Sequence, residues 1–151
     1  MGRRYRLGVL RRLGNLFMSV AVLLGLPRST VLLETVGART GRVRRTPVNV
    51  LRLDDERWLV APYGLVGWVH NVRAAPAATL RRGLVGEPVR LEPADDDVAG
   101  PVLKAYWEAF PITRPFFDAG EDAPPEAFAG EAARHPVFRV VAADPAGKRA
   151  I

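Results

Sequence analysis

The fold of this chain is decided by residues 31–51, which read VLLETVGARTGRVRRTPVNVL. Two apolar runs, Val31–Leu33 and Val48–Leu51, flank a connection rich in glycine, threonine and arginine. Short runs rich in β-branched residues and bounded by glycine and proline are typical of β-strands. The positive charges of the connection are Arg39, Arg42, Arg44 and Arg45. Because glycine lets the backbone fold closely around a ligand and arginine offers forked donors to phosphate or carboxylate, this connection predicts either a pocket for a polyanion or a solvated basic turn.

Length and composition indicate one globular domain. The chain has 151 residues, of which 48% are hydrophobic and 25% charged, which is enough to bury a sizeable core. The net charge of +6 and the pI of about 10.7 favour an acidic partner, such as nucleic acid, an anionic membrane surface or an acidic small molecule. The absence of cysteine excludes disulfides, thiolate catalysis and cysteine metal sites, and it is compatible with a reducing cytoplasm.

The first 27 residues have the pattern of a basic amphipathic helix. Arginines alternate with apolar residues up to Leu13, and an apolar run from Leu16 to Leu26 ends at Pro27. This run is too short to span a bilayer, which takes roughly 20 apolar residues, and no cleavage site follows it. Such a helix either lies on an anionic membrane surface or packs on the domain with its basic face outward. We therefore expect a cytoplasmic protein, peripheral on the inner face of the membrane in the first case, with a helix over 1–27 and a barrel domain over 28–151.

The rest of the chain predicts several more short strands and few helices. Strands are expected over residues 57–62, 78–82, 85–91 and 136–142. Helices are expected over residues 68–75, 98–110 and 126–134. Because strands and helices do not alternate as in βαβ units, a doubly wound parallel sheet is disfavoured. We predict a mainly β, α+β fold, with about six antiparallel strands in a small barrel and flanking helices.

The motifs of common catalytic and metal sites are missing from the sequence. It contains no phosphate-binding G-x-x-x-x-G-K-[ST], no G-x-G-x-x-G after a strand and no zinc-ligand spacing. The two histidines, His70 and His135, lie in different regions and predict no metal site. Ser19 and Ser29 are not in the setting of a nucleophile elbow. An enzyme without an evident acid, base, nucleophile or metal is best explained if a cofactor carries the chemistry.

Three elements of the sequence occur in the same order in one known family. The first is T-x-G-x-R-T-G-x-x-R-x-x-P over residues 35–47, and the second is Val60-Ala61 followed by a glycine-containing loop. The third is W-x-x-N-x-R-A-x-P over residues 68–76. From about Leu32 to Pro76, and more loosely to the last strand, the chain resembles the deazaflavin-dependent nitroreductases of actinobacteria, also called coenzyme F420-dependent quinone reductases.

This resemblance implies a split β-barrel of the FMN-binding type that binds coenzyme F420. It also implies an oxidoreductase that passes a hydride from the reduced cofactor to a quinone, a nitroaromatic or a similar conjugated acceptor. The anion grip implied for this chain consists of Arg39, Thr40, Gly41 and Arg44. The contacts implied for the deazaflavin ring come from Val60, Ala61, Pro62, Tyr63, Trp68 and Asn71. The implied partners are thus a deazaflavin cofactor and a small aromatic acceptor.

The acceptor site is expected to have aromatic walls, because flat aromatic faces suit a flat quinone or nitroaromatic ring. The candidates are Tyr63, Tyr106, Phe116 and Phe117, and the alternative for the last three is ordinary core packing. No side chain is expected to carry the hydride, since the cofactor does so. Phe116 and Phe117 stand where the family has tyrosines, and phenylalanine cannot donate a proton. Tyr63 or water is therefore the candidate proton donor.

Departures from the family pattern keep other functions open. Ala38 stands at a commonly basic position and Val43 at a common proline position, and Pro62-Tyr63-Gly64 replaces a loop with serine or asparagine. These changes leave cofactor binding in place and leave the acceptor open. The alternatives are an FMN-dependent split-barrel oxidoreductase and a non-enzymatic flavin or deazaflavin carrier. Nucleic-acid binding would rest on charge alone and is not expected.

Overall fold

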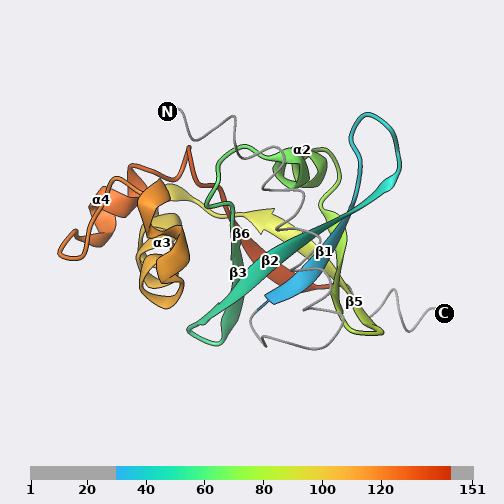
Figure 1. Ribbon diagram of the computed structural model, residues 1–151, viewed down its shortest axis with the longest axis horizontal. Coiled ribbons are helices and arrows are strands. Elements are labelled where there is room, and N and C mark those ends of the chain that lie inside the picture. The colour runs from blue at the N-terminus through green and yellow to red at the C-terminus, as the bar shows by residue number, and fades with distance from the viewer. Residues whose placement is uncertain (1–29, 144–151) are drawn as a thin grey trace.

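A computed structural model describes residues 30–143, and its six strands form a closed antiparallel barrel (Figure 1). The strands are β1 (Thr30–Val36), β2 (Val43–Leu53), β3 (Glu56–Val60), β4 (Ala77–Arg82), β5 (Val85–Pro93) and β6 (Val137–Ala142). Their order around the barrel is β1-β2-β3-β6-β5-β4, and β1 pairs with β4 to close it. The predicted class, about six antiparallel strands in a small barrel, is confirmed.

Residues 31–51 set the register between β1 and β2. Val31 lies opposite Val48, and the pairing continues without a break to Val36 opposite Val43. The strands are therefore longer than the apolar runs alone predict, and the basic connection shrinks to residues 37–42. Next, β2 turns into β3 through Asp54 and Asp55, whose φ angles of 53° and 62° give the two-residue turn that suits a twisted hairpin.

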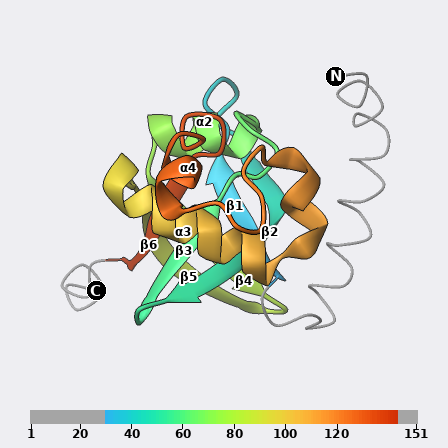
Figure 2. The ribbon, with the colours of Figure 1, turned by 90° about the vertical axis from the view of Figure 1, so that its left-hand side faces the viewer.

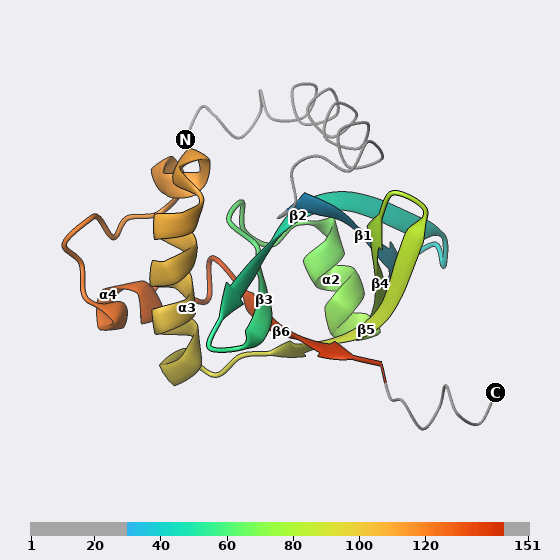
Figure 3. The ribbon, with the colours of Figure 1, turned by 90° about the horizontal axis from the view of Figure 1, so that it is seen from below.

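The interior of the barrel is one apolar core, and helix α2 (Gly67–Ala74) covers one end of it (Figure 3). Alternate residues of each strand point inward, so Leu33, Leu59 and Leu91 are fully buried. The inner face of α2 adds Trp68 and its neighbours Val69 and Val72. A closed barrel leaves its apolar interior open at both ends, and the buried face of α2 supplies the cover that this end needs.

A second core lies outside the barrel, on the outer face of β2 and β3 (Figure 2). It is covered by α3 (Asp96–Ala109), the 3-10 helix η1 (Pro111–Phe116) and α4 (Pro125–Ala129). Leu51, Trp58 and Val60 project outward from the strands into this core. Helices α3 and α4 approach closely at Gly100, where an added Cβ would lie 2.6 Å from the carbonyl oxygen of Pro125.

Two expectations about helices need comment. The helix expected over 126–134 is shorter in the structure, because α4 ends at Ala129. Turns follow from Gly130 on, and the side chain of Glu131 binds the backbone of residues 118 and 119. The helix expected over 1–27 lies outside the described residues. Within residues 30–143, no helix is both long enough and apolar enough to cross a bilayer.

Candidate functional site

The loop between β1 and β2, residues 37–42, is a tight turn that projects at the end of the barrel covered by α2 (Figure 1). The Gly37 N–H donates to the Arg42 carbonyl at 2.7 Å, and the Gly41 N–H donates to the Gly37 carbonyl at 2.9 Å. A Cβ at Gly37 would lie 2.8 Å from Thr40 Oγ1, and Gly41 has a φ of 69°. The same Oγ1 accepts the Arg42 N–H at 3.2 Å. Both glycines, and the Thr40 hydroxyl, are therefore needed to shape the loop.

Three arginines on this loop and on the first residues of β2 are free to bind a ligand. Within residues 30–143, the exposed guanidinium groups of Arg39, Arg42 and Arg44 form no hydrogen bond or ion pair. Arg44 lies opposite Thr35 in the ladder, and the side chains of such a pair share one face of the sheet. That face is the one turned toward α2. Arg42 was not among the residues predicted for the anion grip, and the structure places it on the same loop.

Arg45 is the exception among the basic residues, because it faces the other side of the sheet. Its Nε donates to Glu34 Oε2 at 2.6 Å, and Arg81 Nε donates to Glu34 Oε1 at 2.5 Å. Burial alone would raise the pKa of Glu34, but the hydrogen bonds and charges of the two arginines outweigh it, so that the pKa lies below its ordinary value. Glu34 thus engages Arg45 and Arg81 and offsets part of their charge, whereas the charges of the loop arginines are not offset by an ion pair within residues 30–143.

Asn71 of α2 fastens the loop to the body of the barrel. The Asn71 Oδ1 accepts the backbone N–H of Ala38 at 2.9 Å, and its Nδ2 donates to Thr35 Oγ1 at 3.0 Å. One turn earlier, Trp68 packs against Phe138 in the barrel interior, with ring centroids 5.6 Å apart. The two residues share the buried face of α2, as their spacing predicts. Their contact with a cofactor ring stays a prediction, and the contacts seen are those that hold the loop and fill the core.

The segment from β3 to α2, residues 61–66, lies on the other side of α2 from the basic loop (Figure 1 and Figure 3). Val60, Ala61 and Pro62 are buried, and the Ala61 N–H donates to the Pro136 carbonyl at 2.9 Å. Tyr63, the next residue, turns outward and is 51% exposed. Partial burial raises the pKa of the Tyr63 hydroxyl, so this group keeps its proton at neutral pH.

The four aromatic residues proposed for the acceptor wall separate into two groups. Tyr63 and Phe116 meet edge to face, with ring centroids 4.8 Å apart, and both are partly exposed. Tyr106 is buried, and burial raises its pKa to about 12, although a hydrogen bond with Asn49 opposes the shift. Phe117 is also buried and packs against Phe128, because consecutive residues at the end of η1 point to different sides. Tyr106 and Phe117 therefore pack as core residues, which was the alternative left open for them.

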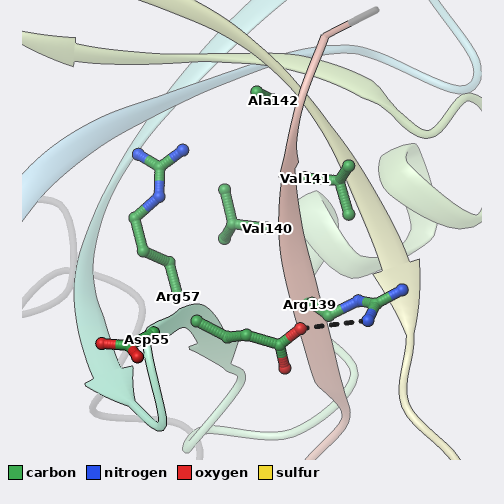
Figure 4. Close-up of a pocket in the computed structure, with 7 residues that line it drawn as sticks. Asp55, Arg57, Arg139, Val140, Val141 and Ala142 are labelled. Carbon is green, nitrogen blue, oxygen red and sulfur yellow. Dashed lines mark hydrogen bonds and ion pairs between the residues drawn. The ribbon is translucent and has the colours of Figure 1, made fainter.

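A surface hollow of about 350 Å³ lies apart from these residues, along β6, the start of β3 and the turn before it (Figure 4). Its two arginines are already paired, since Arg139 binds Glu56 at 3.1 Å and Arg57 binds Glu87 at 2.6 Å. Among residues 30–143, no group of three or more His, Asp or Glu side chains could hold a metal ion. The loop, α2 and the Tyr63–Phe116 pair thus remain the candidate site.

Comparison with known proteins gives this site a context. A family model described as F420H(2)-dependent quinone reductase matches residues 7–114. The solved structure of the F420-H2 dependent reductase FDR-A is similar, with 23% identity and a TM-score of 0.53, over 75% of this chain and 94% of that one.

Two other solved structures share the barrel. A FAD-binding protein from Mesorhizobium loti is 15% identical, with a TM-score of 0.50 over 83% of this chain and 87% of that one. The heme storage protein HutZ from Vibrio cholerae is 13% identical, with a TM-score of 0.53 over 78% and 83%. At these identities the solved structures establish the fold alone. The family model, however, covers well over half of the chain, including the loop, the Tyr63 segment and α2, and the chain therefore belongs to the F420H(2)-dependent quinone reductase family and is an F420-dependent reductase.

Proposed function

We propose that this protein transfers a hydride from reduced coenzyme F420 to a flat conjugated acceptor of the quinone or nitroaromatic class. The observation that carries the proposal is that Arg39, Arg42 and Arg44, on and beside a loop fixed by Asn71, have no partner within residues 30–143. The partly exposed ring of Tyr63 lies on the segment that leads into α2. An anion grip and an aromatic wall are the two features that an anionic cofactor and a flat acceptor require.

The loop suits the phosphate and acidic tail of the cofactor. Arginine forks bind such groups through charge-assisted hydrogen bonds, each worth about 1.5–3 kcal/mol. Within the described part of the chain, the backbone N–H groups of Arg39 and Thr40 have no acceptor, so they too are available to an anion. Because Glu34 is held by Arg45 and Arg81, its carboxylate lies away from the grip. The residues present therefore fit the cofactor that the family implies.

The role of the protein in the reaction is mostly to position the reactants. Bound F420 supplies the hydride, and the chain holds the acceptor close to it and excludes water. The ring pair of Tyr63 and Phe116 offers an apolar wall for the acceptor. The protonated hydroxyl of Tyr63 can give a proton to an acceptor oxygen as negative charge develops there.

The test is a tryptophan-fluorescence titration with oxidised F420 and, in parallel, FMN. The variant Arg39→Ala/Arg44→Ala removes two arginines of the grip. Arg52→Ala/Arg90→Ala is the matched control, since it removes two exposed arginines of the barrel and changes the net charge equally. We expect F420 to bind the wild type and the control, and to bind the grip variant at least 100-fold more weakly. In a separate turnover assay, the wild type should catalyse oxidation of reduced F420 by a quinone, which takes up the hydride.

Other outcomes of the titration and of the turnover assay would redirect the proposal. Binding of FMN alone would assign the sister cofactor, and F420 binding without turnover on any acceptor would indicate a carrier. Equal loss of affinity in the two double variants would mean that net charge, and not the loop, attracts the cofactor. Binding of neither cofactor would refute the proposal.

We also propose a peripheral membrane location, supported by the basic and apolar pattern of residues 1–27. Liposomes with anionic lipids should sediment the full chain and not a chain that lacks residues 1–27. Equal sedimentation of the two would exclude an anchor in this segment.

A further inference from the structure

Two buried polar residues, Glu131 and His135, lie behind the proposed acceptor wall. They belong to the segment between α4 and β6, and the two residues are 3% and 5% exposed. The ring Nε2 of His135 is 3.6 Å from Glu131 Oε1. The backbone N–H of His135 donates to the backbone carbonyl of Glu131 at 3.0 Å. Neither residue belongs to the site described above, and an apolar pair would pack in the same space at less cost in desolvation.

Glu131 holds the chain just after Phe116. Its Oε1 accepts the N–H of Asp118 at 2.8 Å, and its Oε2 accepts the N–H of Ala119 at 2.7 Å. Arg134 supports the same arrangement, because it lies 3.5 Å from Glu131 and 2.7 Å from the Asp118 carboxylate. The carboxylate therefore fixes where η1 ends, and so the place of the Phe116 ring.

His135 faces the chain just before Tyr63. Its ring stacks on Phe117, with centroids 4.3 Å apart, and the polar groups that it meets are Glu131 and the backbone carbonyls of Ala61 and Pro62. Among the residues that the structure describes, neither of its buried ring nitrogens has a hydrogen-bond partner of good geometry. A buried imidazole that lacks a full partner is rare and calls for an explanation. Its place between the two segments that carry the acceptor wall supplies one.

We propose that His135 is a positioning residue, which together with Glu131 sets the separation between Tyr63 and Phe116 and thereby the fit of the acceptor. This proposal rests on the proposed function for its consequence in catalysis, but not for the structural coupling itself. Hydride transfer needs its two partners in a narrow range of distances, so a small shift of one wall changes the reaction strongly. The cofactor grip, on the other side of α2, is not touched.

Protonation of His135 gives a way to perturb, without mutation, the contacts that link the Tyr63 and Phe116 segments. Burial lowers the pKa of His135 below its ordinary value, and the nearby Arg134 lowers it further, while Glu131 and the carbonyls of residues 61 and 62 oppose the shift. The imidazole is therefore neutral at pH 7. In acid, the imidazolium is drawn toward Glu131 and the two carbonyls, and both segments of the wall move with it.

The structural test follows the ring signals of Tyr63 by NMR on the full chain with labelled tyrosine and histidine. The sequence holds three tyrosines and two histidines, so Tyr63→Phe and His70→Gln assign the signals. We expect the Tyr63 signals to titrate in acid with the same midpoint as those of His135. His135→Phe, which keeps the stacking on Phe117, should shift the Tyr63 signals and abolish this titration. The proposal would be refuted if the Tyr63 signals changed neither with the protonation of His135 nor in His135→Phe.

The kinetic test measures F420 affinity and acceptor kinetics on His135→Phe, His135→Gln and the exposed control His70→Gln. We expect unchanged F420 affinity in all three, and a loss of roughly 10- to 100-fold in acceptor kcat/KM for His135→Phe, the scale of a small misplacement. His135→Gln, which restores a polar partner, should recover part of it. A parallel loss of F420 affinity would indicate a general fault in folding and would refute the positioning role. Failure of the wild type to bind F420 would refute the proposed function. The NMR result would then decide whether His135 couples the Tyr63 and Phe116 segments.

Discussion

The side-chain carbonyl of Asn71 accepts the backbone N–H of Ala38 at 2.9 Å, which ties α2 to the basic loop that lies 33 residues earlier in the chain. The same side chain donates to Thr35 Oγ1 at the root of the loop. One buried amide therefore fixes both the base and the first turn of the loop. The loop arginines are thus presented on a fixed support, which lowers the entropy that an anionic ligand must remove on binding.

Removal of this amide should weaken the cofactor site more than the fold. In Asn71→Ala we expect F420 affinity to fall about tenfold, and the free energy of unfolding to fall by about 1–2 kcal/mol, because two hydrogen bonds are lost. Thr35→Val breaks only the bond to Nδ2 and should show a smaller fall in affinity. Fluorescence titration and urea denaturation measure the two effects. An unchanged affinity in Asn71→Ala would show that the loop keeps its shape without α2.

Glu34 should make the stability of the barrel depend on pH. Its pKa in the folded chain lies below the ordinary value of 4.5, so its contribution is present above that pH and is lost as the pH falls through the lowered folded pKa. Glu34→Gln should therefore be less stable than the wild type at pH 7, by about 1–2 kcal/mol, since both arginine partners are partly exposed. The gap should close in acid. Urea melts from pH 2 to pH 7 measure it.

An exposed carboxylate supplies the control for this prediction. Glu92 pairs with Arg139 on the surface, where ion pairs contribute little. Glu92→Gln should thus differ from the wild type by less than about 0.5 kcal/mol at pH 7. A similar loss in both variants would mean that overall charge, and not the two ion pairs of Glu34, sets the pH dependence.

Two glycine-to-alanine substitutions should act in opposite directions. At Gly100 an added Cβ would lie 2.6 Å from the Pro125 carbonyl oxygen, so Gly100→Ala should force α3 and α4 apart and destabilise by about 1–3 kcal/mol. At Gly67 no atom lies within 4 Å of the added Cβ, and Gly67→Ala should stabilise α2 by up to about 1 kcal/mol. Thermal melts of the two variants test the packing of the outer core. Equal stability of the two variants would mean that α4 shifts freely.

Tyr63→Phe should separate proton donation from the aromatic wall. The substitution keeps the ring against Phe116 and removes the hydroxyl, so we expect kcat for the acceptor to fall about 100-fold, the usual scale of general acid catalysis, with little change in KM. Because the pKa of Tyr63 is raised above 10, the wild type should lose this contribution only at still higher pH. Steady-state kinetics against pH measure both effects.

Tyr106→Phe is the matched control for the hydroxyl. It removes a buried hydroxyl that meets Asn49 and should lower stability without a change in the ratio of kcat to KM. If Tyr63→Phe keeps full kcat, water and not Tyr63 is the proton donor.

The sequence predicted the parts of this molecule whose signals are local. Glycine and proline bound the strands, the spacing of Trp68 and Asn71 places both on the buried face of α2, and the glycines of the loop allow its turns. What it missed depends on register and on distant segments. Arg44 and Arg45 look alike in the sequence, and only the pairing of β2 with β1 sends the first toward the loop side and the second to Glu34.

The aromatic wall shows the same limit. Phe116 and Phe117 are identical neighbours in sequence, and only the end of η1 directs one to Tyr63 and the other into the outer core. Glu131 and His135 gave no sequence signal at all, because their partners at residues 61–62 and 118–119 are brought to them by the fold. The helix expected over 126–134 fails for a related reason, since a residue that binds a distant segment interrupts it.

The closed strand order has a consequence for how this protein meets other chains. Each of the six strands is hydrogen-bonded to a neighbour on both sides, with β1 and β4 completing the ring. A partner polypeptide therefore finds no strand with a whole open edge, as it does at the edge of a sandwich. The ring of strands therefore protects the barrel against edge-to-edge aggregation.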